Sequence, residues 1–247
     1  MSTTRFLVDE ATRADIKLRL LGSIAFRFHC PKYESYSDAM NRELTDIDFV
    51  AFSGERKKIR ALFEGLGYVE DRDILVATEG ARYFYRNPQN GLGVDVFFDR
   101  LDYCHPIELV HRLHLDSPTI SLPDLVLEKI QIVELNEKDI KDLIILFLEH
   151  DLGVDERELV DDRYIAAILG NDWGFYYTAT TNLNKVLVFL RRYDVLNDDE
   201  RTIAEERVKR LMTEIESQPK SLKWKMRSKL GPKVRWYKEV SAKEATF

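Results

Sequence analysis

The spacing of hydrophobic and polar positions changes near residue 118. Before that point, short apolar runs with the two-residue period of strands lie at 18–21, 45–52, 81–87 and 94–101. The last two runs are joined by the turn-rich stretch PQNGLG, which predicts a hairpin. Short helices are predicted between the runs, at 10–17, 23–30 and 55–64.

Beyond residue 118 the apolar positions recur with the spacing of helices. Ser121-Leu122-Pro123-Asp124 predicts a helix start, because it offers a cap, an early proline and a first-turn acid. Further helices are expected at 137–150, 161–170, 176–193 and 198–217. The chain is therefore predicted to be an α+β protein, with a small mixed sheet and flanking helices in residues 1–118, a helical domain in 119–217 and a basic tail in 218–247.

Two aspartates, Asp46 and Asp48, interrupt an otherwise apolar strand, and both point to the same face. Two carboxylates in a partly dry site do not both ionise cheaply unless a cation lies between them. Asp95, flanked by Val94 and Val96 on a later strand, supplies a third carboxylate. Oxygen ligands with open positions suit Mg²⁺. The alternative is a structural one, in which the aspartates cap or pair with lysines on a different α/β fold.

The charge of the chain is unevenly spread. The whole chain has a net charge of −6, but residues 220–238 contain eight Lys or Arg and no acid, which leaves 29 basic and 43 acidic residues elsewhere. This tail also holds Trp224, Trp236 and Tyr237. Cations with aromatic rings are typical of RNA binding, although the tail could equally be docked on the acidic body by its rings.

Composition excludes several classes of protein. No apolar run is long enough to span a bilayer, and the first ten residues lack the basic-then-apolar order of a signal peptide. Two cysteines give neither a disulfide framework nor a zinc finger. A cytoplasmic protein without a membrane partner is expected.

The order of these motifs resembles that of the nucleotidyltransferase superfamily, the fold shared by DNA polymerase beta and the minimal nucleotidyltransferases. The resemblance rests on LLGS (20–23), TDIDFV (45–50) and VDVFF (94–98). RELTDIDF is similar to a motif of abortive-infection-type nucleotidyltransferase toxins, with Leu44 where Ser or Thr is usual. The later Lys and Lys-Asp-x-x-Asp motifs of that group fall on Lys129 and on Lys138-Asp139 with Asp142. The gap between Ser23 and Asp46 is longer than in many members.

The resemblance implies a metal-dependent transfer of an NMP group from an NTP to a hydroxyl acceptor, with release of pyrophosphate. RNA such as tRNA, or a protein, is the expected acceptor, through the basic tail at 220–238, and a cognate antitoxin is an expected partner. A non-catalytic nucleotide-binding or interaction module on the same fold is the alternative. The implied catalytic residues and ligands of Mg²⁺ or Mn²⁺ are Asp46, Asp48 and Asp95, and the implied nucleotide-binding residues are Gly22, Ser23, Arg42, Lys129 and Asp139.

Three of the later residues also have an ordinary explanation. Lys129 could equally be the polar face of an amphipathic helix. Asp139 and Asp142 could form a solvated face with local ion pairs, and for Asp142 this explanation is slightly favoured.

Overall fold

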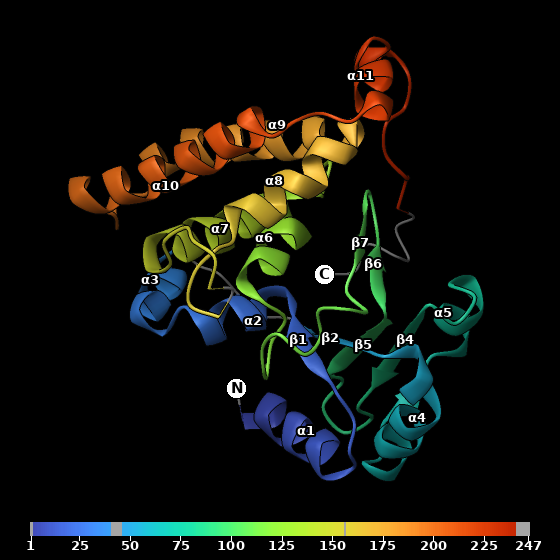
Figure 1. The fold of residues 1–247 in the computed structure, drawn as a ribbon. Coiled ribbons are helices and arrows are strands. Elements are labelled where there is room, and N and C mark those ends of the chain that lie inside the picture. Colours follow the sequence, from blue (N-terminus) through green and yellow to red (C-terminus); the bar gives the residue numbers. More distant parts are fainter. Residues whose placement is uncertain (1, 41–45, 156, 241–247) are drawn as a thin grey trace.

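The computed structural model describes residues 2–40, 46–155 and 157–240, and a five-stranded mixed sheet lies in its N-terminal half (Figure 1). The strands Ile47–Ala51 and Gly93–Phe98 pair in parallel, and the other neighbouring strands of this sheet pair antiparallel. A separate antiparallel pair, β6 (Arg100–Asp102) and β7 (Pro106–Glu108), follows β5. The sheet order is β1 (Arg19–Leu21), β2 (Ile47–Ala51), β5 (Gly93–Phe98), β4 (Arg82–Arg86) and β3 (Val69–Glu70).

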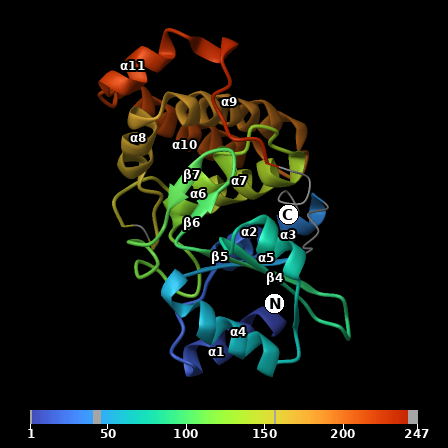
Figure 2. The same ribbon diagram turned by 90° about the vertical axis from the view of Figure 1, so that its right-hand side faces the viewer.

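Helices cover the sheet and build the remainder of the molecule (Figures 1 and 2). The helices within the first half are α1 (Ser2–Arg13), α2 (Gly22–His29), α3 (Glu34–Ala39), α4 (Arg56–Gly65) and α5 (Arg72–Ala77). The later ones are α6 (Leu122–Ile130), α7 (Glu137–Glu149), α8 (Asp162–Asn171), α9 (Trp173–Phe189), α10 (Asp198–Ser217) and α11 (Leu222–Ser228). Short 3₁₀ turns lie at Pro31–Tyr33, Ser53–Glu55, Leu190–Arg192 and Gly231–Lys233.

The two faces of the sheet carry different residues. Phe63 of α4 stacks on Tyr85 of β4 with ring centroids 4.4 Å apart, so this row of the sheet faces α4. Tyr85 is the register partner of Val94, which pairs in turn with Ile47. Side chains alternate along a strand, so Asp48 and the neighbouring row point away from α4, towards α2 and the helical part.

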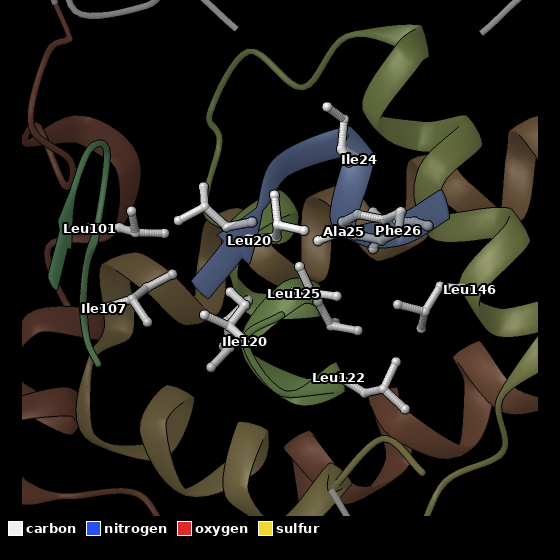
Figure 3. Packing of buried hydrophobic residues seen from close by; sticks show 14 of the residues in the cluster. Leu20, Ile24, Ala25, Phe26, Leu101, Ile107, Ile120, Leu122, Leu125 and Leu146 are labelled. Atoms are coloured by element: carbon white, nitrogen blue, oxygen red, sulfur yellow. The ribbon is translucent and has the colours of Figure 1, made fainter. Parts of the chain in front are cut away.

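One hydrophobic core joins the sheet to the helices. The Leu20 N–H donates to the Pro118 carbonyl at 2.8 Å, and the Ile120 N–H donates to the Leu20 carbonyl at 2.9 Å. Leu20, Leu125 and the side chains of α2 lie together in this core (Figure 3). The cluster of buried apolar residues therefore continues across residue 118, and the division of the chain into domains at that point stays a prediction.

The predicted α+β class, with a small mixed sheet and a helical C-terminal part, is confirmed. The four predicted strands correspond to β1, β2, β4 and β5, and β4 and β5 form the predicted hairpin. The prediction of the first helix at 10–17 is wrong, since α1 spans Ser2–Arg13. Thr4, Leu7 and Ala11 are buried at helical spacing and fix its true position. None of the described helices is both long enough and apolar enough to cross a membrane.

The aromatic rings of the basic tail pack on the body. Trp224 contacts Tyr176 of α9 with ring centroids 5.1 Å apart, and Trp236 contacts Tyr177 at 5.1 Å. Trp236 Nε1 also donates to Thr178 Oγ1 at 3.0 Å. The rings thus anchor the tail on the body, which is one of the two alternatives that the sequence leaves open. An RNA-binding role for the tail stays a prediction, and it rests on the exposed cations Lys223, Lys225, Lys229, Lys233 and Arg235.

The end of this tail reaches the β6–β7 hairpin. The Lys238 N–H donates to the Cys104 carbonyl at 3.0 Å, and the Lys238 ammonium contacts Asp102.

The Trp236→Ala substitution should expose Cys104, because it removes the ring that holds this segment on α9. We expect Cys104 to react several-fold faster with a thiol reagent, measured by mass spectrometry. Cys30, which is buried, and the exposed-site variant Lys233→Ala serve as controls, and an unchanged Cys104 rate would contradict the anchoring role.

Candidate active site

Two of the predicted carboxylates are immediate neighbours in the sheet. Asp48 on β2 and Asp95 on β5 are register partners on adjacent parallel strands, which lie about 4.8 Å apart. Both are withdrawn from water, with exposed fractions of 5% and 1%. The Asp46 carboxylate lies against Gly93, where a Cβ atom would approach Asp46 Oδ1 to 2.9 Å. The structure therefore brings the three aspartates to one end of the central strand pair.

Gly22 lets the chain approach this cluster closely. Its φ is +69°, a conformation that favours glycine, and a Cβ atom at this position would overlap Oδ2 of Asp48. The Gly22 N–H donates to Glu128 Oε2 at 3.0 Å, and Ser23 follows in the first turn of α2. A carboxylate therefore already accepts the backbone N–H of Gly22, one of the residues that the resemblance implies for nucleotide binding. A phosphate would have to displace Glu128 or use the turn beyond it.

Lys129 lies within an acidic cage. Its Nζ is 2.9 Å from Asp139 Oδ1 and 3.6 Å from both Glu128 Oε1 and Asp142 Oδ2. Every residue of α6 is buried, so Lys129 is not on a solvated helix face, and Asp139 and Asp142 are buried as well. The ordinary explanation of these residues as solvated is wrong, because α6 and α7 pack inside the molecule. Direct contact of Lys129 and Asp139 with a nucleotide stays a prediction.

The cluster carries more negative than positive charge. Burial raises the pKa of Asp48 well above its usual range, and the charges of Asp95 and Glu128 raise it further, against the opposing effect of Lys129. Burial also raises the pKa of Asp95, to about 6, although its contact with Arg82 lowers it. Among the described residues the cluster contains two cations, Arg82 and Lys129. Its carboxylates are those of Asp46, Asp48, Asp95, Glu128, Asp139 and Asp142.

One carboxylate oxygen of the cluster suits a metal ion. Asp48 Oδ1 is buried, and within the described part of the chain no group donates a hydrogen bond to it. A carboxylate oxygen without a donor, in a site of excess negative charge, fits a divalent cation. The described residues contain no preformed group of three His, Cys, Asp or Glu side chains that could hold a metal. The donors that fit are Asp46 and Asp48, since Asp95 bonds to Arg82.

A cavity of about 370 Å³ opens beside this cluster. Its walls include Glu128, Lys129 and Asp139 on one side, and Tyr237 and Val240 of the C-terminal segment on another. The cavity is large enough for a small ligand. The basic tail therefore contributes to the surroundings of the candidate site as well as to the surface.

The structure adds two residues that the sequence interpretation missed. Arg82 faces Asp95 across the β4–β5 hairpin, and the register of that hairpin could have indicated it. Glu128 reaches Gly22 from α6, more than a hundred positions away, and no local pattern predicts such a contact. Arg42, predicted to contact the nucleotide, lies outside the described residues.

Comparison of the chain with protein-family models, with curated proteins and with solved structures found no match. The membership of the nucleotidyltransferase superfamily that its motifs predict stays a prediction.

Replacing Asp48 by Asn should stabilise the metal-free protein at pH 8 and leave its stability at pH 4 nearly unchanged. The raised pKa of Asp48 means that the folded state keeps a proton that the unfolded state has already released. The free energy of unfolding therefore falls as the pH rises from about 4 towards neutrality, and each unit of raised pKa is worth about 1.4 kcal/mol.

Urea denaturation at a series of pH values measures this effect. Asp9→Asn, on the exposed face of α1, is the matched control. An Asp48→Asn protein less stable than the wild type at pH 8 would contradict the excess of negative charge.

Replacing Lys129 by Met should lower the free energy of unfolding by about 3–5 kcal/mol, because it leaves three buried carboxylates without their shared cation. Denaturation by urea at pH 7 measures the change. Lys138→Met, an exposed lysine of the same region, should change stability by less than about 0.5 kcal/mol. Equal effects of the two substitutions would show that Lys129 does not neutralise the cage.

Proposed function

We propose that the protein is a metal-dependent nucleotidyltransferase that moves an NMP group from an NTP to a hydroxyl acceptor. The observation that supports this most strongly is the pair of buried aspartates, Asp48 and Asp95, side by side on parallel strands. One oxygen of Asp48 has no hydrogen-bond donor among the described residues, and the backbone of Gly22 packs directly against the same carboxylate.

In this proposal Asp46 and Asp48 hold Mg²⁺ or Mn²⁺. When bound, the ion would supply positive charge for the triphosphate and for the departing pyrophosphate. The excess of buried negative charge favours binding of such an ion, because the described residues of the cluster include more carboxylates than cations.

The other residues position and deprotonate the reactants. Asp95 is mostly ionised at neutral pH, since its pKa is about 6, and it can accept the proton of the acceptor hydroxyl. The acceptor oxygen then bonds to the α-phosphorus, and the bond from that phosphorus to the oxygen leading to the β-phosphate breaks. The cavity beside Lys129 is the place where the structure offers room for the nucleotide or the acceptor.

The acceptor we favour is RNA or a protein with an anionic surface. Lys223, Lys225, Lys229 and Lys233 of the tail suit contacts with phosphates, because their side chains are exposed. The rings of Trp224 and Trp236 are committed to α9, so base stacking on them is not part of the proposal.

A non-catalytic nucleotide-binding module is the second candidate, and two observations favour it. Asp95 is paired with Arg82, and the Gly22 N–H is paired with Glu128. A protein that only binds nucleotides does not need either group to take part in chemistry.

Label transfer tests the proposal. The purified protein is incubated with each α-³²P-labelled NTP, ATP included, with Mg²⁺ and with total tRNA or a cell lysate as acceptor. We expect label on an acceptor with the wild type, and at least a hundredfold less with Asp46→Ala and with Asp48→Asn. Asp9→Asn is the control with full transfer.

The melting temperature separates the two candidates. Binding of Mg²⁺ with an NTP to the folded state should raise it, and Asp48→Asn should remove most of the rise. A rise without label transfer would favour the non-catalytic module. Neither a rise nor transfer would contradict both candidates.

A further inference from the structure

Arg82 forms a buried ion pair with Asp95, one of the three aspartates. Its Nε lies 2.5 Å from Asp95 Oδ1, and both side chains are buried, with exposed fractions of 3% and 1%. Arg82 stands on β4, one position along the same face from Phe84, the register partner of Asp95. The guanidinium also lies 5.4 Å from the centre of the Phe97 ring. The ion pair is therefore built into the centre of the sheet.

The two neighbouring carboxylates differ in how they are neutralised. Asp95 has the guanidinium of Arg82, whereas Oδ1 of Asp48 lacks a hydrogen-bond donor among the described residues. Both carboxylates lie at the same level of two adjacent parallel strands. Within the described part of the chain, a cation therefore pairs directly with Asp95, and none forms such a pair with Asp48.

We infer that Arg82 provides the second positive charge of this site, so that the chain binds one divalent cation, at Asp46 and Asp48, and not two. The inference rests on the proposed function, since it concerns the same cluster. Arg82 is a positioning residue, because it acts through Asp95. It orients that carboxylate and balances its charge.

A metal ion on Asp95 would meet two obstacles. It would have to separate a buried guanidinium from its carboxylate partner, which leaves an always-charged group unpaired in the interior. It would also bring two more positive charges next to Arg82, in surroundings where charges are poorly screened. The Asp48 side offers neither obstacle, so a single ion is expected there.

Counting bound Mn²⁺ tests the inference without any assay of activity. Electron paramagnetic resonance reports free Mn²⁺ during a titration of the protein with Mn²⁺ alone. We expect one ion per wild-type chain, and loss of that ion in Asp48→Asn. Arg82→Gln removes the guanidinium charge and should allow a second ion to bind, while Arg82→Lys keeps a cation and should bind one.

Anomalous diffraction from Mn²⁺-soaked crystals locates the ions counted in solution. The wild type should show one peak beside Asp46 and Asp48, and Arg82→Gln a second beside Asp95. Arg100→Gln, a half-exposed arginine of β6, is the control and should match the wild type.

The outcomes separate this inference from the proposed function. Two ions per wild-type chain, or one ion in Arg82→Gln, would overturn the role of Arg82 and leave the nucleotidyltransferase proposal standing. No ion in the wild type would count against the metal site itself, and hence against both. If Arg82→Gln does not fold, the wild-type count and the position of its peak still decide the question.

Discussion

The structure depends on how a small group of buried carboxylates is neutralised. Lys129 sits within about 3.6 Å of three of them and is itself almost fully buried, so it links α6 to α7 by charge as well as by packing. Burying charges costs a large free energy of desolvation, which only close pairing offsets. Around Asp48 that offset is incomplete among the described residues, because Arg82 and Lys129 pair with other carboxylates. Buried carboxylates with strongly shifted pKa values cluster at functional sites.

The fold brings this imbalance about through long-range contacts. The central strands place Asp48 beside Asp95, α2 brings Gly22 against Asp48, and α6 carries Glu128 to the N–H of Gly22. The shared hydrophobic core holds α2 and α6 on the sheet, so the geometry of the cluster follows from the packing of the whole chain. The tail then closes one side of the neighbouring cavity with Tyr237 and Val240.

The sequence predicts the parts of this arrangement that have local signals. The two-residue period of the strands and the turn between 87 and 93 predict β2, β4 and β5, and hence that Asp46 and Asp48 share a face. The partners of Lys129, and the contacts of Arg82 and Glu128, depend on how separate elements pack, which single-residue patterns do not encode. The aromatic residues of the tail are a further example. From the sequence they fit stacking on nucleic-acid bases as well as packing on α9, and only the structure shows that they pack on α9.

The protonation state of Asp48 reports the electrostatic balance of this cluster. Carbon-13 NMR of the aspartate carboxyl groups, assigned with Asp48→Asn, follows that state as the pH is changed, with and without Mg²⁺. We expect a pKa well above the ordinary value of about 3.9 in the metal-free protein, and loss of the proton when Mg²⁺ is added at constant pH. An ordinary pKa that Mg²⁺ does not change would contradict the claim that this site is built around unneutralised negative charge.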